Sequence, residues 1–410
     1  MKLLVVSQYF WPENFRINDL AEELIKRGHD VTILSGLPNY PDGKIFPQYR
    51  DDPKAFSRFH GATVVRVPVI PRGSSNLLLL LNYLSFVFMG VVIGAWKLRT
   101  QRFDAVFVFQ TSPITSALPA LLIGRLKRAP VSMWVLDLWP ETLSAIGIVK
   151  SPRLLGLVGG LVRFIYRHCA LILVQSRAFY GNVAHYAGGT DKIRYFPGWA
   201  ETVFESDGAT VIAPELAPYA SDFKVLFAGN IGEAQDFPAI VKAADLTRDI
   251  PNLRWIIVGD GRAAADAISE VQRRGLNDRV VFVGRFPIEK MPGFFEGADA
   301  LLVSLAAKPI WSMTIPGKVQ SYLMSGKPIL GMLDGEGGRV IEEAGAGLVC
   351  PASDARKLAE NVLALIGRSA SDRARMGEAG RSYCAQEFGR DDLISQLEGW
   401  MKPVADRGYG

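Results

Sequence analysis

The chain has 410 residues, which is too long for one ordinary hydrophobic core and suits two domains of about 150–200 residues each. Apolar residues make up 49% of it and charged residues 21%, which argues against intrinsic disorder, and its three widely spaced cysteines predict neither a disulfide framework nor a metal site. The net charge of +5 combines 23 Lys and Arg against 12 Asp and Glu in residues 1–200 with 23 against 29 in residues 201–410. The basic first half suits nucleic acid, an anionic membrane or a phosphorylated substrate, and the alternative is a surface charge that serves only solubility.

Strand and helix signals alternate along the first half. Residues 2–8 form a short apolar run, residues 18–28 have apolar positions at helical spacing, and residues 29–36 form the next apolar run. We expect the first run to be a β-strand and not a secretion signal, because it has neither a long apolar core nor a cleavage site. Later β-branched runs cover 62–70, 104–110, 131–138 and 170–176. Together they predict a parallel sheet covered by helices on both faces.

Residues 77–96 form a stretch of twenty residues without a charge, long enough to span a bilayer. A span would put the strands before and after it on opposite sides of the membrane, where they could not share a sheet. Between Arg66 and Arg128 there are eight basic residues and one acid, Asp104. We therefore expect a surface helix that dips into an anionic leaflet, and the alternative is a helix buried in the first domain.

The second half repeats the pattern of apolar runs, at 223–230, 253–260, 279–285, 299–305, 327–333 and 347–351. The predicted fold class is α/β, with two doubly wound Rossmann-like domains that face each other across a cleft. The expected boundaries are a first domain at 1–200, a linker at 201–220 and a second domain at 221–385. We expect a C-terminal helix at 386–410 to pack back on the first domain.

Two glycine-rich turns follow strands of the second half. Gly259 and Gly261, with Ala264, match the pattern G-x-G-x-x-A, but no acid follows at the distance that a dinucleotide site requires. We interpret this turn as a place where a phosphate or a sugar can approach the backbone. The loop with Gly229 and Gly232 leads into a predicted helix whose first amides can receive a phosphate, unless its glycines serve only a tight turn.

The segment 314–329 carries two lysines and no acid. Lys318 follows Pro316 at the start of a predicted helix, where a positive charge opposes the helix dipole unless an anion answers it. We therefore predict a diphosphate beside Lys318, and the alternative is a solvated surface lysine. Farther on, Glu336 and Gly337 lie in another glycine-rich turn, where Glu336 could bond sugar hydroxyls. No D-x-D pattern is present, so we expect neither a metal ion nor another cofactor.

The chain resembles glycosyltransferase family 4, the retaining GT-B enzymes that build bacterial surface polysaccharides. In the first half the resemblance rests on Tyr9–Gly43 and Val135–Leu143, and in the second half on the glycine-rich turns, their strands and the stretch from Thr314 through the turn at Glu336. The subgroup that it resembles includes colanic-acid and N-acetylfucosamine transferases. The resemblance implies that the second domain binds a nucleotide-sugar and that the first domain binds the acceptor.

The family's donor-site pattern is altered in this chain. An Arg and a Lys that contact the diphosphate in many members match Asn230 and Gln235, and two glutamates eight residues apart match Ser312 and Gln320. Gln320 can still bond ribose hydroxyls, and the phosphate role moves towards Lys318. Arg285 and Phe286 match the positions whose backbone atoms contact the base in the family.

The resemblance implies transfer with retention at the anomeric carbon, assisted by the leaving diphosphate. We expect Lys318 to stabilise that leaving group, with Asp137 and Glu13 as contacts on the acceptor side. The expected donor is a nucleotide-sugar, with UDP as the nucleotide, and the expected acceptor is a lipid-linked sugar. No nucleic acid partner is expected, and the enzyme should sit peripherally on the inner face of the cytoplasmic membrane. The alternatives are a nucleotide-sugar epimerase and a non-catalytic scaffold that binds nucleotide-sugar.

Overall fold

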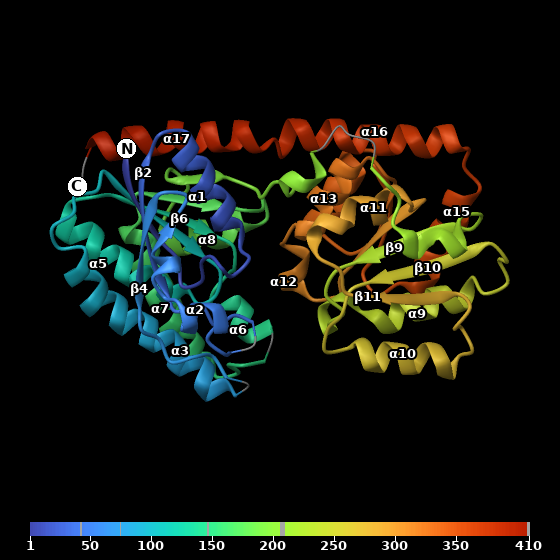
Figure 1. The fold of residues 1–410 in the computed structure, drawn as a ribbon, viewed down its shortest axis with the longest axis horizontal. Coiled ribbons are helices and arrows are strands. Elements are labelled where there is room, and N and C mark those ends of the chain that lie inside the picture. The colour runs from blue at the N-terminus through green and yellow to red at the C-terminus, as the bar shows by residue number, and fades with distance from the viewer. Residues whose placement is uncertain (42, 74, 146, 206–209, 408–410) are drawn as a thin grey trace. The chain divides into compact units, whose positions relative to one another are not determined.

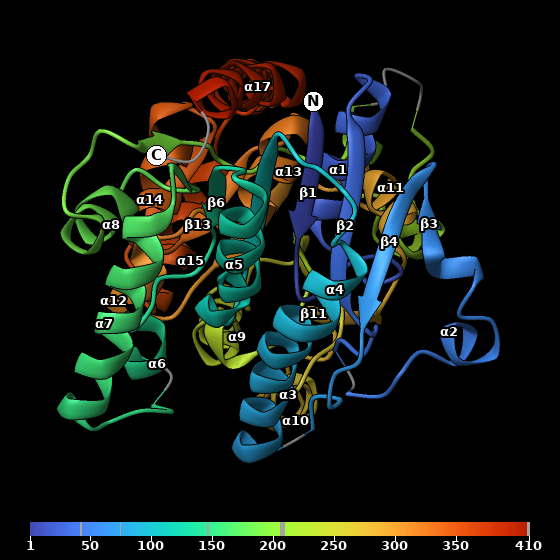
Figure 2. The ribbon, with the colours of Figure 1, turned by 90° about the vertical axis from the view of Figure 1, so that its left-hand side faces the viewer.

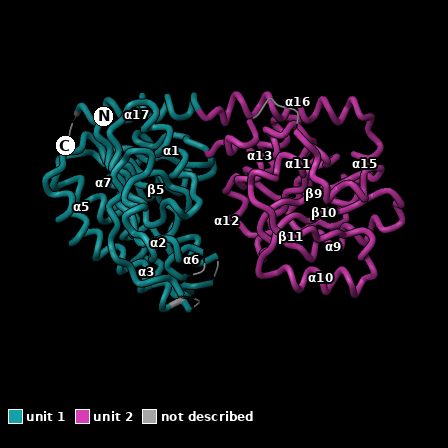
Figure 3. Tube along the Cα trace, in the orientation of Figure 1, with its two compact units in different colours: residues 1–197, 391–410 teal, residues 198–390 magenta. Residues whose placement is uncertain are grey.

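The computed structural model describes residues 1–410 except 42, 74, 146, 206–209 and 408–410. The chain divides into two compact units (Figures 1 and 3): unit 1 comprises Met1–Pro197 and Asp391–Gly410, and unit 2 comprises Gly198–Arg390. The described part of the predicted linker 201–220 belongs to unit 2. Residues 206–209 of that linker, and 408–410 of the predicted C-terminal helix, lie outside the described residues.

Unit 1 contains an eight-stranded sheet in the order β3-β4-β2-β1-β5-β6-β7-β8. Its neighbouring strands are parallel except for the short edge strand β3, which runs antiparallel to β4. The strands are β1 (Lys2–Val6), β2 (Asp30–Gly36), β3 (Arg58–Phe59), β4 (Ala62–Val67), β5 (Ala105–Gln110), β6 (Val131–Val135), β7 (Leu171–Val174) and β8 (Ile193–Tyr195). Strand order reverses between β1 and β5, which makes this the topological switch point of the unit.

Helices cover both faces of this sheet. They are α1 (Arg16–Lys26), α2 (Pro47–Asp51), α3 (Asn76–Met89), α4 (Ala95–Lys97), α5 (Ala117–Lys127), α6 (Glu141–Ala145), α7 (Pro152–His168), α8 (Phe179–Ala187) and α17 (Arg390–Arg407). Figure 2 shows α3, α5 and α7 together on one side of the sheet, with α5 in contact with both others. Helix α1 buries one face through Ile17, Leu20 and Leu24, as its apolar spacing predicts.

The C-terminal helix α17 lies beside the end of α1. Arg27 reaches it through Nη1, which donates to Ser395 Oγ at 2.8 Å and pairs with Glu398 Oε2 at 3.1 Å. His29 Nε2 lies 2.6 Å from the other oxygen of Glu398. These contacts attach the end of the chain to the unit in which the chain begins.

Unit 2 contains a fully parallel six-stranded sheet in the order β11-β10-β9-β12-β13-β14. Its strands are β9 (Phe223–Ala228), β10 (Leu253–Val258), β11 (Val280–Gly284), β12 (Ala300–Ser304), β13 (Ile329–Met332) and β14 (Gly347–Cys350). Its helices are α9 (Phe237–Leu246), α10 (Ala264–Arg273), α11 (Met291–Glu296), α12 (Pro309–Ser312), α13 (Gly317–Ser325), α14 (Glu336–Glu343), α15 (Ala355–Ile366) and α16 (Ala370–Glu387). The switch point lies between β9 and β12.

The sheet of unit 2 separates two hydrophobic cores. Along β9, Phe227 packs into the core that includes α9 and α15, whereas Leu226 packs into the core that includes α13 and α14. Ile257 and Ile256 divide in the same way along β10. Successive side chains of a strand point to opposite faces, so a strand buried on both faces must be apolar throughout. Both units are therefore doubly wound α/β folds, which confirms the predicted fold class.

The uncharged segment 77–96 is helical from end to end. It forms α3, a π-helical turn at Gly90–Gly94 and α4. Leu77–Lys97 is long and apolar enough to cross a membrane by length and composition, and 22% of its most apolar window is buried in the protein. Gly90 packs against Pro119 and Gly94 against Leu34, so the helix lies along unit 1. Strands before and after it share one sheet, as expected.

Candidate active site

The carboxyl ends of β9 and β12, at the switch point of unit 2, carry two loops that bond to each other. Ser304 Oγ donates to the carbonyl oxygen of Gln235 at 2.7 Å, and the backbone N–H of Ala306 donates to the carbonyl oxygen of Ala234 at 2.8 Å. Ligands of open α/β sheets bind at this position. Helix α13 begins beside it, with Gly317 as its first residue.

Lys318, in the first turn of α13, turns its side chain inwards. Its Nζ is shielded from solvent, has no hydrogen-bond partner among the described residues, and lies 3.4 Å from the centroid of the Phe227 ring. A Cβ atom at Gly229 would lie 2.7 Å from Lys318 Cε, so a side chain at this position after β9 would displace the end of the Lys318 side chain. The solvated surface lysine, the alternative considered above, does not fit these contacts.

The electrostatic setting of Lys318 disfavours its charge. Burial lowers the pKa of Lys318 from 10.5 to about 7. The first turn of α13 contains no acid, so the ammonium also opposes the helix dipole. The π face of Phe227 compensates in part. A diphosphate beside Nζ would supply the missing hydrogen bonds and opposite charge.

The predicted glycines hold the loops at close approach. A Cβ atom at Gly259 would lie 1.9 Å from the carbonyl oxygen of Gly229, and one at Gly261 would lie 2.2 Å from that of Ile231. Gly259 also has a φ of +148°, which few residues with side chains adopt. The turn after β10 therefore packs directly on the loop after β9. A contact of these glycines with a ligand stays a prediction.

The neutral residues of the loop after β9 bond to one another. Gln235 Oε1 accepts from the backbone N–H of Gly232 at 3.2 Å and from Asn230 Nδ2 at 3.5 Å. A side chain at Gly232 would displace the Asn230 amide, because a Cβ atom would lie 2.6 Å from Asn230 Nδ2. These bonds shape the loop and add no positive charge. Lys318 brings a cation to this loop, because its Nζ would lie 3.0 Å from a Cβ atom at Gly229.

The other predicted donor residues surround α13 and the neighbouring loops. Gln320 is buried, and with its amide turned so that the nitrogen faces the backbone it donates to the carbonyl oxygens of Pro316 at 3.0 Å and Gly317 at 3.1 Å. A Cβ atom at Gly337 would lie 2.9 Å from Pro316 Cδ, so the turn before α14 packs on the start of α13. Gln320 thus stabilises the first turn, and its predicted ribose contact stays untested.

Glu336 and the residues after β11 have structural contacts of their own. Both carboxylate oxygens of Glu336 pair with Arg339, at 3.0 and 3.1 Å. Phe286 packs against Phe294 with 4.8 Å between ring centroids, and Arg285 is exposed. A sugar bound by Glu336 would share that carboxylate with Arg339.

A carboxylate that sequence reasoning missed lies against α13. Ser321 Oγ donates to Glu201 Oε2 at 2.6 Å. The two residues are 120 positions apart, and Glu201 precedes a short 3-10 helix, Thr202–Phe204. The acid that is absent from 314–329 is therefore present beside that segment in space. Nothing in the spacing of the sequence could have signalled it.

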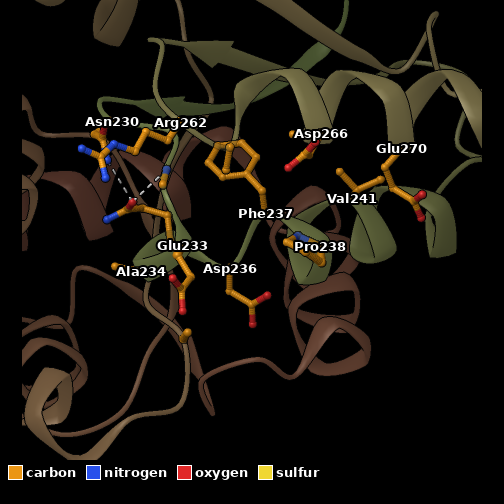
Figure 4. Close-up of a pocket in the computed structure, with 15 residues that line it drawn as sticks. Asn230, Glu233, Ala234, Asp236, Phe237, Pro238, Val241, Arg262, Asp266 and Glu270 are labelled. Carbon is orange, nitrogen blue, oxygen red and sulfur yellow. Dashed lines mark hydrogen bonds between the residues drawn. The ribbon is translucent and has the colours of Figure 1, made fainter. Parts of the chain in front are cut away.

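A cavity of about 1000 Å³ lies between the loop after β9 and α10 (Figure 4). Asn230, Gly232 and Gln235 contribute to its lining, and Arg262 lies beside Asn230. Its acidic lining residues are Glu233, Asp236, Asp266 and Glu270. Four carboxylates against one guanidinium, that of Arg262, disfavour a diphosphate in this cavity. Lys318 does not line it, and the predicted diphosphate beside Lys318 stays untested.

In unit 1, Asp137 follows β6 within a network of hydroxyl groups. Its Oδ1 accepts from Thr142 Oγ1 at 2.5 Å, and Ser112 and Trp139 also bond to it. Burial raises the pKa of Asp137, and these hydrogen bonds partly offset the shift. Asp137 thus lies near the carboxyl edge of the sheet, and its predicted contact with the acceptor stays untested.

Glu13 has a different environment. Its Oε1 accepts from the backbone N–H groups of Asn39 at 2.8 Å and Tyr40 at 2.7 Å, and its Oε2 accepts from Phe10 at 3.0 Å. The side chain is buried, and burial raises its pKa against the opposing effect of these bonds and of Arg66. Glu13 holds two loops together, and its predicted contact with the acceptor stays untested.

We predict that Glu13→Ala destabilises unit 1 by roughly 3–5 kcal/mol, because it leaves three amides and the buried Arg66 without their acceptor and counter-charge. Urea unfolding followed by circular dichroism measures this loss. The control is Glu22→Ala, which removes a surface pair with Lys26 at 2.8 Å and should change stability by about 0.5 kcal/mol or less. If the Glu13 variant is as stable as the parent, the fold does not require this carboxylate, and a role in acceptor binding would explain it better.

Metal binding has no visible basis in the described part of the chain. No group of three or more His, Cys, Asp or Glu side chains there could hold a metal ion. The charge of a diphosphate would have to be balanced by Lys318 and backbone amides. The expectation of a metal-free reaction stays a prediction.

Comparisons with known proteins match both units. Residues 14–199 match the family model for a glycosyl transferase 4-like domain, and residues 222–368 match that for glycosyl transferases group 1. The chain is 25% identical over 345 residues to WcaI of Escherichia coli (strain K12), described as a colanic acid biosynthesis glycosyl transferase, over 80% of this chain and 82% of WcaI. It is 24% identical over 348 residues to WbjE of Pseudomonas aeruginosa, described as a probable glycosyltransferase, over 82% and 83%.

A solved structure shares the fold of the whole chain. The structure of HepE from Anabaena in complex with UDP superposes with a TM-score of 0.70 at 16% sequence identity. The match covers 98% of this chain and 100% of HepE. At this identity the likeness concerns the fold of the two units.

Proposed function

Because the chain belongs to the glycosyltransferases of the GT-B fold, with a glycosyl transferase 4-like domain followed by a group 1 domain, we propose that it transfers a hexose or an amino-deoxyhexose from a nucleotide-sugar to a lipid-linked sugar. The product would enter exopolysaccharide, capsule or O-antigen assembly. The likeness to WcaI supports this setting. The observation that carries the proposal is the shielded ammonium group of Lys318, which has no hydrogen-bond partner among the described residues.

Unit 2 is the proposed donor domain. Lys318 and the first amides of α13 would bind the diphosphate, beside the loop that contains Gly229 and Gly232. The predicted contacts of Gln320 with ribose, of Arg285 and Phe286 with the base, and of Glu336 with the sugar are part of this proposal. The UDP complex of HepE supports UDP as the nucleotide.

Retention of the anomeric configuration follows from front-face attack. The bond between the anomeric carbon and the diphosphate breaks as the acceptor hydroxyl adds from the same face, and that hydroxyl's proton passes to the leaving diphosphate. Lys318 and the helix terminus stabilise the charge that develops on the diphosphate. Asp137 would orient the acceptor hydroxyl on the side of unit 1, where its hydrogen bonds hold the carboxylate in place.

The membrane surface is the proposed place of reaction. The outward ridge of the α3–α4 segment consists of large apolar side chains that are between 51% and 65% exposed: Leu77, Leu80, Leu84, Phe88, Val92 and Trp96. Residues 66–168 contain twelve Lys and Arg and three Asp and Glu. An apolar ridge among basic side chains suits an anionic leaflet, which would bring unit 1 to a lipid-linked acceptor.

The function is tested with purified protein, bacterial membranes and a panel of UDP-, GDP- and dTDP-sugars. We expect one donor to raise the melting temperature and to transfer its labelled sugar to a lipid extract. Lys318→Ala should lose both effects, whereas Lys327→Ala, whose ammonium pairs with Glu296 at the other end of α13, should keep them. Donor conversion without an acceptor would indicate an epimerase, and binding without turnover would indicate a scaffold. Either result would overturn the proposal.

A further inference from the structure

A group of polar side chains at the switch point of unit 1 lies outside the donor site proposed in unit 2. Tyr9 lies beyond the end of β1, and Ser112 lies beyond the end of β5. Tyr83, from the inner side of α3, hydrogen-bonds to Ser112. Arg72 interacts electrostatically with both Tyr9 and Tyr83. Switch points are where such sheets bind ligands, so this group is a candidate site.

The guanidinium group of Arg72 is held in place by contacts other than an ion pair with a described residue. It stacks on the ring of Tyr40 at 4.9 Å from the centroid, and its backbone N–H donates to Asn39 Oδ1 at 3.0 Å. Gly43 packs on the Arg72 backbone so closely that a Cβ atom would lie 1.6 Å from its carbonyl oxygen. Among the described residues, no carboxylate forms an ion pair with Arg72. A half-buried, fixed guanidinium of this kind suits an anionic ligand.

The groups around Arg72 narrow the class of that anion. Burial raises the pKa of both Tyr9 and Tyr83, so both phenols stay protonated. Tyr9 Oη donates to Asn82 Oδ1 at 3.3 Å, which leaves Tyr83 as the phenol that can donate to a ligand. A forked guanidinium beside a neutral hydroxyl donor matches the oxygens of a phosphate or a diphosphate. Five residues beyond Arg72, the exposed ridge of α3 begins with Leu77. A phosphate bound at Arg72 would therefore lie next to an apolar surface.

We propose that Arg72, with Tyr83, binds the phosphate group that joins the acceptor sugar to its lipid, and that the lipid chain leaves along the ridge of α3. The ligand class is a phosphate or diphosphate ester of a long apolar alcohol. This inference rests on the proposed function, because it assigns a site to its lipid-linked acceptor. The same helix would then touch the bilayer with one face and the phosphate group with the other.

The test measures binding of farnesyl diphosphate, pyrophosphate and farnesol by titration calorimetry. Arg72→Gln should lower the affinity for farnesyl diphosphate roughly 10- to 100-fold, and Tyr83→Phe should lower it several-fold, because each variant loses a bond to the phosphate. Arg99→Gln is the matched control, since Arg99 also stacks on an aromatic ring, that of Trp96 at 4.5 Å, but at the far end of the segment. It should bind like the parent. Farnesol should bind the parent and Arg72→Gln equally.

Three outcomes would overturn the inference. Arg72→Gln and Tyr83→Phe could both bind farnesyl diphosphate like the parent, or Arg99→Gln could lose as much affinity as Arg72→Gln. Pyrophosphate could bind as tightly as farnesyl diphosphate, which would make this a site for free phosphate and not for a lipid. Binding of the nucleotide-sugar to the Arg72 variant is measured in parallel. If neither the parent nor the Arg72 variant binds the nucleotide-sugar, the proposed function fails, whereas binding of farnesyl diphosphate still tests the site at Arg72.

Discussion

Lys318→Met is expected to make the unliganded protein more stable and to abolish donor binding. Methionine matches the length of most of the lysine stem and removes a shielded charge that has no hydrogen-bond partner among the described residues. With the pKa of Lys318 lowered from 10.5 to about 7, the gain in unfolding free energy at pH 7 should be on the order of 3–5 kcal/mol. Loss of the charge-assisted bonds to a diphosphate should lower the affinity for the nucleotide-sugar at least ~100-fold.

The stability difference between the methionine variant and the parent should depend on pH in a defined direction. Between pH 7 and pH 10.5 the unfolded chain binds the Lys318 proton and the folded chain does not, so the parent's stability rises with pH across this window. Below pH 7 both states are protonated and the slope vanishes. The methionine variant lacks this contribution. Its advantage over the parent should therefore be largest at and below pH 7 and disappear towards pH 10.5.

Urea unfolding of the two proteins at several pH values measures this difference, and titration calorimetry measures donor binding. Lys327→Met is the control, because its ammonium is paired with Glu296 at 3.5 Å and should yield no comparable gain. A methionine variant that is less stable than the parent at pH 7 would show that Lys318 supports the fold. Its role as the phosphate ligand would then have no energetic basis.

The strands could be predicted from the sequence because a strand buried on both faces must be apolar at every position. The run 223–230 contains β9, and its side chains alternate between two cores, as in Phe227 and Leu226. The edge strands β3 and β8, of two and three residues, were not predicted. Strands that short carry too few residues for a periodic signal.

The site could be predicted only where its residues are close in sequence. Lys318 was recognisable because a lysine in the first turn of a helix opposes the dipole. The carboxylate of Glu201 was not, because its contact with Ser321 depends on how a segment 120 residues away is folded. Glu13 looked like a site residue, and only the structure shows that three backbone amides use its oxygens.

The uncharged helix shows where composition misleads. Asn82 and Ser85 count against membrane insertion in a hydropathy sum, but both face unit 1. Asn82 Nδ2 donates to the carbonyl oxygen of Ile70 at 2.6 Å, and Ser85 Oγ accepts from the backbone N–H of Ile70 at 2.9 Å. The outward face is therefore more apolar than the average of the segment. Hydropathy averages lose the direction in which each side chain points.

The double variant Leu84→Glu/Phe88→Glu is expected to lose membrane binding while it keeps its fold. The two side chains are 51% and 62% exposed, so each adds about 1–2 kcal/mol if it enters the interface, and each new carboxylate is repelled by anionic lipid. Together these effects should lower the partition coefficient at least ~100-fold. Co-sedimentation with phosphatidylglycerol vesicles measures it. Parent binding should weaken with phosphatidylcholine or at high salt, which also separates surface binding from a true span.

The matched control places the same chemistry on unit 2, in Leu246→Glu/Leu363→Glu, at side chains that are 52% and 42% exposed. It should sediment with vesicles like the parent, because neither position belongs to the ridge of α3. Equal melting temperatures of the three proteins would show that the folds are intact. If the ridge variant binds vesicles as well as the parent, or if the control loses as much, another surface attaches the protein to the membrane. A parent that resists release by high salt would instead favour insertion of Leu77–Lys97 into the bilayer.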